Sequence, residues 1–597
     1  MENNRYAKKL NILFCVASLG LGHATRTLPL IEFFKNQGHK ITVLSYAKAL
    51  DFLKKELSDE KIEYISFEDY PKLERGKGLK FYYYLVTDLI QTTKIIKKEK
   101  EFLKNREFDL IISDGRYGFN SKHIPSFLIS HQISFIPPKA LAPFKFISDI
   151  GNIKYFKNFH KVLIPDFKEK EFSLAGKLSH NYLTKFFNYE YVGILSSYKK
   201  IETNEKIDYL FVISGYLDEH KDSFVSKLIN QAKNLEGKKV FILGDTSKKD
   251  VLTLENNITI YPIATSNLRK KLFNCAEVII SRTGYTTIMD LIEMDKKGIL
   301  FPTPNQTEQE YLAKYHSKKN WFITNNNDKN FNLKEMINNL NKTKPHPKNE
   351  KSKDSIEKIK NIIDFYLNES FFSIIIPAFN EEKYIENTLN HITNLNYTNY
   401  EVIIVENGST DNTYKIAKQY ENEKIKVIKS KKGVSIAKNE GIKHISKNSE
   451  YTIFLDADTI IEKNFLKELN LFLKEKNYVI GTTSIKPYNS NSKKDKLWYK
   501  FYDISHKITQ TSYSIQIIKS DLLKNVKFDE ELNFSEDIKF IKDAKKYGKF
   551  FFFNTNSVAT STRRFKKDGY VKTLIKWSIQ ANLPEFLKKN SNYNPIR

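Results

Sequence analysis

Short apolar runs alternate with amphipathic stretches along the first part of the chain. The pattern indicates a buried strand over NILFCVA (11–17), a turn and helix over GLGHATRTLPLIEFFKNQG (20–38), and a second strand over KITVLSY (40–46). Further strands are indicated by FDLIISD (108–114) and SFLISHQ (126–132). Because strands and helices alternate, we expect an α/β fold with a parallel, doubly wound sheet.

The same rhythm starts again near residue 207 and a third time near residue 371. Strands of the second unit are indicated by IDYLFVISG (207–215), KKVFILGD (238–245) and AEVIISR (276–282), and FFSIIIPA (371–378) opens the third unit. The stretch 325–370 is polar and carries two prolines, which is typical of a domain-ending helix and a linker. We therefore divide the chain into two Rossmann-like lobes, 1–200 and 201–340, a linker with a helix at 341–370, and a third α/β domain at 371–597.

The charge composition limits the kinds of binding partner that we expect. The 597 residues carry 97 Lys+Arg against 70 Asp+Glu, a formal net charge of +27, which favours anionic partners such as acidic headgroups or phosphorylated substrates. A solvated, lysine-rich surface explains the same charge. We expect no nucleic-acid partner, because no compact arginine-rich stripe or nucleic-acid motif accompanies it.

Localisation signals point to the cytoplasm. Cys15 and Cys275, the two cysteines, lie in apolar surroundings and read as core residues, so we expect no disulfide framework and no cysteine metal site. The N-terminal apolar stretch is strand-like, which does not fit a signal peptide, and no run of 18 apolar residues predicts a membrane span.

Two loops of the first 325 residues carry candidate chemistry. In SLGLGHATR (18–26), Gly20 and Gly22 separate a strand from a helix, where backbone can approach an anionic ligand. His23 can project into a cleft as a base or as a contact to a phosphate or hydroxyl group. In SRTGYTTIMDLIEMDKKGILFPTPNQTEQEYLA (281–313), we expect Thr286 and Thr287 to cap a helix whose amides face a diphosphate. Asp290 is suited to ribose hydroxyls and the Gln/Glu cluster after 305 to sugar hydroxyls.

Together these loops resemble the family-28 glycosyltransferases, the group that includes the enzyme adding N-acetylglucosamine to the lipid-linked peptidoglycan precursor. The resemblance covers residues 8–325 and includes SDGRYG…PSFLISHQ (113–132). It implies a GT-B fold with the acceptor in lobe 1–200, the nucleotide-sugar donor in lobe 201–340, and no cofactor. By motif position His23 is the cleft base, and the donor-binding residues are Arg282, Gly284, Thr286, Thr287, Asp290, Gln306, Gln309 and Glu310.

Two departures from the family pattern concern the donor. VISGYLDEH (212–220) stands where the family has a Gly-rich phosphate loop, and Glu310 replaces the family's second glutamine. The identity of the donor is therefore open.

The third unit places polar side chains at the ends of successive strands. Asn380 and Glu381 follow the first strand, Glu406 and Asp411 the second, and Asp456 and Asp458 the third. Two carboxylates spaced i, i+2 on an extended edge can share one hard cation, with a diphosphate completing its shell.

This set resembles the family-2 glycosyltransferases of GT-A fold, over residues 371 to about 580. By position, Pro377, Asn380, Glu381, Glu406 and Asp411 line the nucleoside pocket, while Asp456 and Asp458 hold Mg²⁺ or Mn²⁺ and the diphosphate. Asp537 is the catalytic base, with Glu536 beside it, and Arg563 and Arg564 neutralise the leaving diphosphate. The Glu406–Asn407 pair departs from the Asp-Asp common in this family. The Gln-x-x-Arg-Trp motif of processive members is absent, which favours single-sugar addition.

These resemblances imply a bifunctional glycosyltransferase of the hexosyltransferase class. We expect UDP-sugars as donors and a glycan or polyprenyl-phosphate-linked acceptor in the synthesis of surface polysaccharide or another glycoconjugate. Two alternatives remain for the N-terminal half: a non-catalytic sugar- or lipid-binding scaffold, or an isomerase like the UDP-sugar 2-epimerases.

Two aromatic and basic stretches predict a peripheral contact with the inner face of the membrane. They are Leu79–Arg106 and Lys493–Ile515, the second with Trp498, Tyr499, Phe501 and Tyr502. Aromatic rings at headgroup depth with nearby lysines are typical of interfacial helices. Ordinary core helices with solvated lysines explain both stretches equally well.

Overall fold

The computed structural model describes residues 9–71, 79–137, 142–143, 145–213, 221–244, 250–325, 330–488, 490, 492–532 and 535–581. The side chains at 79–83, 85, 564, 574, 576–578 and 580–581 also lie outside this description. The chain divides into two compact units, Met1–Phe365 and Tyr366–Arg597.

The first sheet of unit 1 is a parallel Rossmann-like sheet with the order β3-β2-β1-β4-β5-β6-β7. Its strands are β1 (Asn11–Val16), β2 (Lys40–Ser45), β3 (Glu63–Ser66), β4 (Leu110–Asp114), β5 (Ser126–Ile129), β6 (Lys161–Ile164) and β7 (Tyr189–Tyr191). The accompanying helices are α1 (Gly22–Asn36), α2 (Ala47–Leu57), α3 (Leu79–Lys104) and α4 (Lys145–Phe156). All neighbouring strands run parallel, as the alternation of elements predicts.

The second sheet repeats this design with the order β10-β11-β9-β8-β12-β13-β14. Only the edge pair β10–β11 is antiparallel among its described pairs. Its strands are β8 (Ile207–Val212), β9 (Lys239–Ile242), β10 (Leu252–Leu254), β11 (Ile258–Tyr261), β12 (Ala276–Arg282), β13 (Lys297–Phe301) and β14 (Ile323–Thr324). The helices are α5 (Lys221–Ala232), α6 (Ser266–Cys275), α7 (Tyr285–Glu293), α8 (Thr307–His316) and α9 (Leu333–Asn338).

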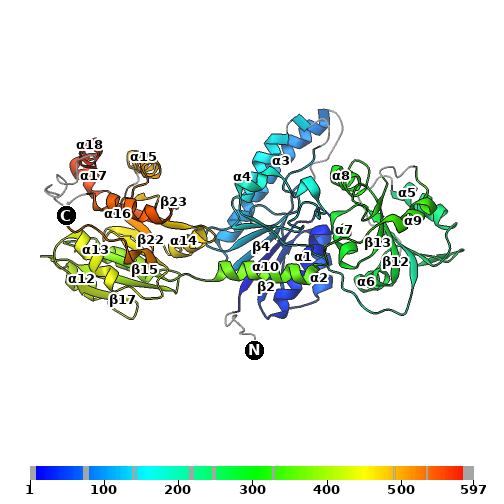
Figure 1. Cartoon of the computed structure of the whole chain (residues 1–597), viewed down its shortest axis with the longest axis horizontal. Helices are drawn as coiled ribbons and strands as arrows, with labels where there is room; N and C mark the ends of the chain where they lie inside the picture. The colour runs from blue at the N-terminus through cyan, green and yellow to red at the C-terminus, as the bar shows by residue number, and fades with distance from the viewer. Residues whose placement is uncertain are drawn as a thin grey trace. The chain divides into compact units, whose positions relative to one another are not determined.

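The continuous apolar strands of the second sheet are buried on both faces. One cluster packs α6 and α7 against the sheet, and another packs α5 and α9 against its other side (Figure 1). Buried parallel strands are expected to read as unbroken apolar runs, which is the pattern of the sequence. Cys15 and Cys275 are both buried and unbonded, as predicted.

Helix α10 (Ser352–Leu367) packs against unit 1 at the connection between its two sheets. Ser352 donates to Glu293 Oε2 at 2.8 Å, and Lys358 Nζ donates to the carbonyl of Tyr191 at 2.6 Å. A side chain on Gly193, which has φ +83°, would meet Ser355 Oγ at 2.6 Å. The polar stretch after residue 340 therefore ends in a helix that contacts both lobes.

Unit 2 is built on a mixed sheet of order β17-β16-β15-β18-β22-β20-β23. Its strands are β15 (Phe372–Ala378), β16 (Tyr400–Glu406), β17 (Ile425–Lys429), β18 (Tyr451–Leu455), β20 (Tyr478–Thr483), β22 (Ile515–Lys519) and β23 (Lys549–Phe553). A small second sheet has the order β19-β24-β21, from β19 (Thr459–Ile461), β21 (Lys486–Tyr488) and β24 (Val558–Ser561).

Helices cover both faces of the main sheet of unit 2. Those on one side include α11 (Ile385–Thr393) and α14 (Phe465–Leu473), and those on the other include α13 (Val434–Lys443) and α16 (Glu536–Ala544). Four more helices are α12 (Thr413–Lys418), α15 (Lys493–Thr509), α17 (Arg563–Asp568) and α18 (Tyr570–Ala581). Strands β15, β16 and β18 end at the polar motifs that the sequence singles out.

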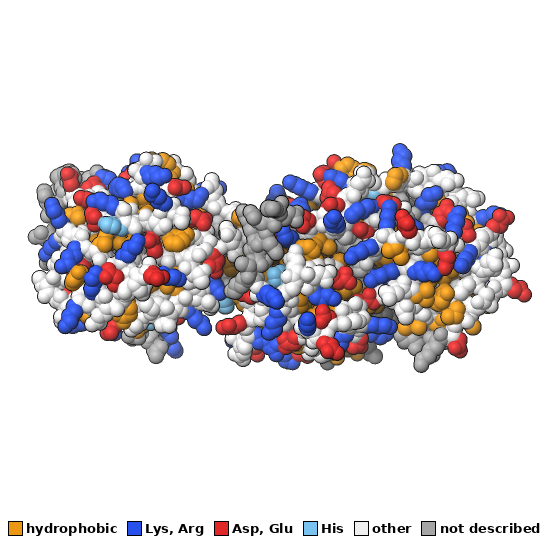
Figure 2. Space-filling model, turned by 90° about the horizontal axis from the view of Figure 1, so that it is seen from below, with side chains coloured by type: hydrophobic (Ala, Val, Ile, Leu, Met, Phe, Trp, Pro, Cys, Tyr) orange, Lys and Arg blue, Asp and Glu red, His pale blue; other side chains and the backbone are white. Residues whose placement is uncertain are grey.

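Two further observations concern membrane-spanning helices and the distribution of surface charge. Among the described residues, no helix combines the length and apolarity that crossing a membrane requires. On the face drawn in Figure 2, lysines and arginines are interspersed with acidic side chains rather than gathered into one stripe.

Candidate functional sites

The first site lies where α1 follows β1. His23 and Arg26, in the first turns of α1, converge on the buried Asp114 at the end of β4. His23 Nδ1 is 2.6 Å from Asp114 Oδ1, and Arg26 Nε donates to Asp114 Oδ2 at 2.6 Å. Burial opposes ionisation of Asp114, but the charges of Arg26 and His23 outweigh it and hold the pKa of that carboxyl well below its usual range. An ionised Asp114 therefore orients the His23 imidazole.

Gly115 makes room for this arrangement. Its φ of +75° lies in the left-handed region, and a Cβ built on it would stand 2.9 Å from His23 Cε1. Only glycine adopts this backbone at low cost while leaving the imidazole in place. The turn after β4 thus positions His23 as much as α1 does.

A second histidine links this cluster to the other lobe. His131, just after β5, accepts from Arg26 Nη1 at 2.8 Å through Nδ1, and its Nε2 is 2.9 Å from Glu308 Oε1 on α8. Its ring stacks on Tyr285 at a centroid distance of 4.1 Å. Burial lowers the pKa of His131 despite the nearby Glu308, so the imidazole is neutral near pH 7 and donates from Nε2.

Asp114 and His131 were not among the residues predicted for this site. The signal for them is a polar residue directly after a buried strand, in FDLIISD and SFLISHQ, because strand ends of a parallel sheet gather at one edge.

The N-termini of α1 and α7 meet between the lobes. A Cβ on Gly22 would lie 3.4 Å from Thr286 Cγ2 and Oγ1. The prediction that Thr286 and Thr287 cap α7 is wrong: the helix begins at Tyr285 with Gly284 as its N-cap, and no side chain caps it. The two threonines lie inside the first turn, which leaves the amides there uncapped by side chains and directed toward α1.

The remaining predicted donor residues of unit 1 lie around α7 and α8. Asp290 accepts from Ser196 Oγ at 2.5 Å, and burial raises its pKa to about 7. Gln309 accepts from the Thr303 amide at 2.9 Å and donates to Gln306 at 2.6 Å, and Glu310 accepts from the Asn305 amide at 3.0 Å. These three side chains shape the loop after β13.

Arg282 is buried at the end of β12. Its guanidinium lies 4.0 Å from the Phe224 ring centroid and donates to the Pro302 carbonyl at 3.1 Å. The segment 214–220, which holds most of the altered phosphate loop, lies outside the described residues.

The second site, in unit 2, begins with two loops at the ends of β15 and β16. Asn380, with φ +55°, accepts from the Thr410 amide at 2.8 Å, and Asp411 accepts from the Glu382 amide at 3.2 Å. Hydrogen bonds from Thr413 and backbone amides outweigh burial and lower the pKa of Asp411. Glu406 accepts from the Ser409 amide at 2.5 Å. Hydrogen bonds therefore hold the loop after β15 against the loop after β16, and Pro377 lies at the end of β15 next to them.

One buried oxygen in this region has no hydrogen-bond partner among the described residues. Asn407 is 5% exposed, its amide N–H donates to the Ala378 carbonyl at 3.1 Å, and its Oδ1 is unpaired. An unpaired buried carbonyl oxygen points to an absent donor.

Arg563 connects two of the predicted carboxylates. Its guanidinium donates to both oxygens of Glu381 at 2.8 Å and lies 3.1 Å from Asp458 Oδ2. The side chain of Arg564 lies outside the described residues. Asp456 precedes Asp458 in the turn between β18 and β19. No three potential metal ligands form a group within the described part of the chain.

The predicted base lies beside a lysine that the sequence analysis did not name. Lys438, buried in α13, is 2.6 Å from Asp537 Oδ1 and 3.8 Å from Glu536 Oε1. The neighbouring carboxylates outweigh burial and raise the pKa of Lys438 well above its usual range, so it stays charged. Burial, and then the charge of Asp537, raise the pKa of Glu536 to about 7. One carboxylate and one partly protonated carboxyl thus share one ammonium.

Two family models match the chain in tandem. The glycosyltransferase family 28 C-terminal domain matches residues 219–365, and glycosyl transferase family 2 matches residues 373–540.

Curated relatives match shorter stretches. The minor teichoic acid biosynthesis protein GgaB of Bacillus subtilis is 28% identical over 38% of this chain and 27% of its own length. The poly(ribitol-phosphate) beta-N-acetylglucosaminyltransferase TarS of Staphylococcus aureus is 28% identical over 28% of this chain and 31% of its own. The glycosyltransferase GlyG of Streptococcus pneumoniae is 30% identical over 28% of this chain and 56% of its own. The chain thus spans less than two thirds of each.

Solved structures resemble the chain only in part. Residues 1–349 of S. aureus TarS match 36% of this chain and 68% of that one, at 23% identity and a TM-score of 0.28. The glycotransferase of kitacinnamycin matches 60% of this chain and 95% of that one, at 12% identity and a TM-score of 0.40. Within one chain, a match to the family 28 glycosyltransferase C-terminal domain model is therefore followed by a match to the glycosyltransferase family 2 model.

Proposed function

We propose that the chain is a bifunctional glycosyltransferase, in which each unit transfers a sugar from a nucleotide-sugar donor. The observation that carries the proposal is a cluster of ionisable side chains in each unit, His23 with Asp114 in unit 1 and Lys438 with Asp537 in unit 2, in a chain that two glycosyltransferase family models match. UDP-sugars as donors, and a glycan or polyprenyl-phosphate-linked acceptor, complete the proposal.

In unit 1, His23 is proposed to take the proton from the acceptor hydroxyl. The ionised Asp114 fixes the Nδ1 side of the ring at 2.6 Å, which leaves Nε2 as the proton acceptor. The acceptor oxygen forms its bond to the anomeric carbon while the bond to the donor diphosphate breaks. Amides at the start of α7 then face the departing diphosphate.

In unit 2, Asp537 is proposed as the base for the same exchange of bonds. Its carboxylate is held by the buried Lys438 and takes the acceptor proton. Asn407 Oδ1 is placed to accept an N–H of the donor base, because it is buried and unpaired. Arg563 supports the leaving diphosphate, exchanging carboxylate partners for phosphate oxygens.

A divalent cation fits the carboxylates of this unit. Asp456 and Asp458 offer the hard oxygen atoms that Mg²⁺ or Mn²⁺ prefers, and Asp458 faces Arg563, the proposed diphosphate contact. When bound there, the cation would offset charge that develops on the diphosphate. We propose Asp458 and Asp456 as the residues that hold it.

A panel of nucleotide sugars, tested on the full chain, decides the proposal. His23→Ala should abolish transfer from one donor and Asp537→Asn transfer from another, each leaving the other activity intact. If no nucleotide sugar is turned over, the proposal fails. Turnover of a donor without any acceptor, lost in His23→Ala, would make unit 1 an isomerase. Binding without turnover in unit 1 would make it a scaffold.

A lipid-linked acceptor implies that the protein works at the inner face of a membrane. For the stretch Leu79–Arg106 this stays a prediction. The described side chains of α3 include exposed Val86, Leu89 and Ile90, whereas those at 79–83 and 85 lie outside the description.

A further inference from the structure

Helix α15 carries an exposed apolar stripe. Leu497, Phe501, Ile504 and Ile508 are 72%, 47%, 52% and 75% exposed. At 3.6 residues per turn, these four positions fall within about 60° of one another, on one face of the helix. Four large apolar side chains in a row on a water-facing surface are unusual for a face without a partner.

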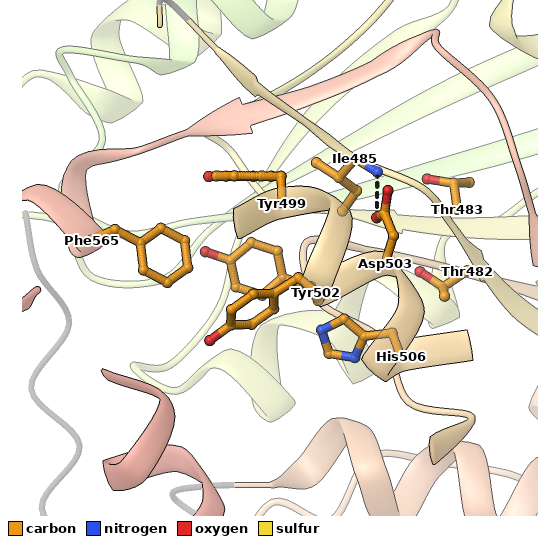
Figure 3. Close-up of a pocket in the computed structure, with 9 residues that line it drawn as sticks. Thr482, Thr483, Ile485, Tyr499, Tyr502, Asp503, His506 and Phe565 are labelled. Atoms are coloured by element: carbon orange, nitrogen blue, oxygen red, sulfur yellow. Dashed lines mark hydrogen bonds between the residues drawn. The ribbon is translucent and has the colours of Figure 1, made fainter. Parts of the chain in front are cut away.

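The opposite face of α15 already has its packing partners. Tyr499 and Tyr502 are buried, and Asp503 accepts from the Ile485 amide at 3.0 Å (Figure 3). Together with His506 they line a small pocket against β20, and no predicted site residue lines it. The stripe is therefore not the side of α15 that the core of unit 2 needs. The prediction from sequence that the aromatic side chains of Lys493–Ile515 face lipid headgroups is wrong for Tyr499 and Tyr502, because both are buried in the core of unit 2.

Helix α18 extends the stripe. Val571, Ile575 and Ile579 follow one another at every fourth position and are 63%, 54% and 60% exposed. The two helices are joined by the rings of Trp498 and Tyr570, whose centroids are 5.1 Å apart, and Tyr570 also donates to Asp495. In Figure 1 the two helices lie along the same edge of unit 2. We call these seven side chains the α15–α18 surface.

The exposed charges that the structure describes on α15 and α18 are all lysines. All five lysines of α15 are exposed, at 493, 494, 496, 500 and 507, and Lys572 is exposed on α18. The acids of α15 point the other way: Asp495 is buried against Tyr570, and Asp503 is bound to the backbone of Ile485. The segment forming α18 contains no acid. Apolar side chains accompanied by lysines on the same two helices match an anionic lipid surface, and they fit an ordinary protein partner less well.

The surface also adjoins the proposed transfer site. Helix α17, which links β24 to α18, begins at Arg563, the residue in contact with Asp458. Phe565 of α17 packs on Tyr499 and Tyr502 of α15, at centroid distances of 5.7 and 5.5 Å. A membrane touching this surface would therefore lie beside the site of unit 2.

We propose that the α15–α18 surface docks unit 2 on anionic lipid headgroups, so that its site receives a lipid-linked acceptor. The docking itself follows from the surface alone, whereas the role of the acceptor rests on the proposed function. Apolar side chains enter the headgroup region, and the lysines add attraction that salt screens.

Co-sedimentation of the full chain with vesicles tests the proposal. The vesicles contain either phosphatidylcholine alone or equal parts of phosphatidylcholine and phosphatidylglycerol. We expect binding to the second kind only, reversed by salt. Leu497→Ser with Ile508→Ser should weaken this binding at least tenfold, and Lys493→Glu with Lys496→Glu should weaken it as well. Val251→Ser with Leu252→Ser, which changes apolar residues of unit 1 that are 51% and 50% exposed, is the control and should bind like wild type.

Three results would overturn the proposal. They are absence of binding to anionic vesicles, equal losses in the stripe variant and the control, and a dimer in solution that the stripe variant dissociates. Transfer by unit 2 to a soluble glycan acceptor, measured without vesicles, separates this proposal from the proposed function. If vesicle binding holds and no transfer occurs under any condition, the proposed function fails and the docking stands.

Discussion

Glu536 and Asp537 share the Lys438 ammonium, and the pKa of Glu536 is raised. Because the pKa of Glu536 is raised to about 7, this carboxyl is largely protonated at pH 6. Glu536→Gln mimics that neutral form, so we expect near wild-type transfer by unit 2 at pH 6 and a growing difference above pH 7, where the wild-type group ionises. Asp537→Asn should lose about 10²- to 10⁴-fold in kcat/KM at either pH while retaining UDP binding. Equal losses in both variants at pH 6 would make Glu536 the base.

Asp290 makes the stability of unit 1 depend on pH. Burial raises its folded pKa to about 7, whereas the unfolded value is about 4. Between these values the folded state binds more protons, so the free energy of unfolding falls as pH rises from about 4 to 7, and levels off above. Asp290→Asn removes this proton uptake. Relative to wild type, the variant should gain about 3 kcal/mol between pH 4.5 and pH 8, at about 1.4 kcal/mol per pKa unit, measured by urea unfolding at each pH. A parallel pH dependence in both proteins would contradict the assignment.

The residues that the sequence analysis missed are those defined by contacts between distant segments. His131 and Glu308 lie 177 positions apart, and Lys438 and Asp537 lie 99 apart. A strand-end motif signals that a polar side chain reaches the sheet edge, but its partner comes from a different motif. Lys438 sits inside an amphipathic helix, where a lysine in sequence reads as surface charge. Only the packing of α13 against α16 shows that it is buried.

At the level of elements, the turn after β4 decides how α1 presents His23. We expect Gly115→Ala to displace the imidazole, because the new Cβ would stand 2.9 Å from His23 Cε1. Gly38→Ala is the matched control: its φ of +80° imposes a similar backbone cost of about 1–2 kcal/mol, and nothing lies within 4 Å of its Cβ. Both variants should lower the Tm, Gly115→Ala by at least as much as Gly38→Ala, while only Gly115→Ala should lose transfer by unit 1. Equal rates of transfer in the two variants would show that the position of His23 does not matter for the reaction.

The elements themselves were predictable because each buried strand of a parallel sheet is an unbroken apolar run. The βα rhythm predicted the first strand of each main sheet, at β1, β8 and β15, whereas β6, β7 and β20 were not among the strands it indicated. The prediction that Thr286 and Thr287 cap α7 was wrong, because Gly284 occupies the N-cap position and both threonines follow it inside the helix. The two faces of α15 could not be separated from sequence, because apolar residues occur on both and only the fold selects the one that packs.

Helix α10 belongs to the stability of unit 1. Ile359 and Ile363 in this helix are fully buried, and Lys351 and Ser352 hold its start to α7 through Ile292 and Glu293. A chain ending at residue 340 loses these contacts, whereas one ending at residue 368 keeps them. We expect the shorter chain to be less stable by about 3–6 kcal/mol, estimated from burial of two isoleucines. Thermal unfolding of the two truncated chains measures this, and equal Tm values would show that α10 contributes nothing to the fold of unit 1.

At the scale of the whole molecule, the proposed function gives the two units different means of holding a diphosphate. Unit 1 offers the N-termini of α1 and α7, which meet at Gly22 and Thr286. Unit 2 offers the carboxylates Asp456 and Asp458 together with Arg563. The first arrangement needs no ion, whereas two carboxylates repel a diphosphate unless a cation lies between them. On the proposed function, one chain would combine two donor sites with opposite requirements for a cation.

Chelation should separate the two sites in the intact chain. With saturating EDTA, we expect calorimetry to show UDP binding at one site, and addition of Mn²⁺ to restore a second. Asp458→Ala should lack the Mn²⁺-dependent site and keep the other, because it removes a carboxylate without touching unit 1. Thr286→Glu should do the reverse, since a carboxylate at the start of α7 repels the diphosphate there. Two sites that both survive EDTA would exclude Asp458 as a cation ligand, and loss of both would show that unit 1 also depends on a metal ion.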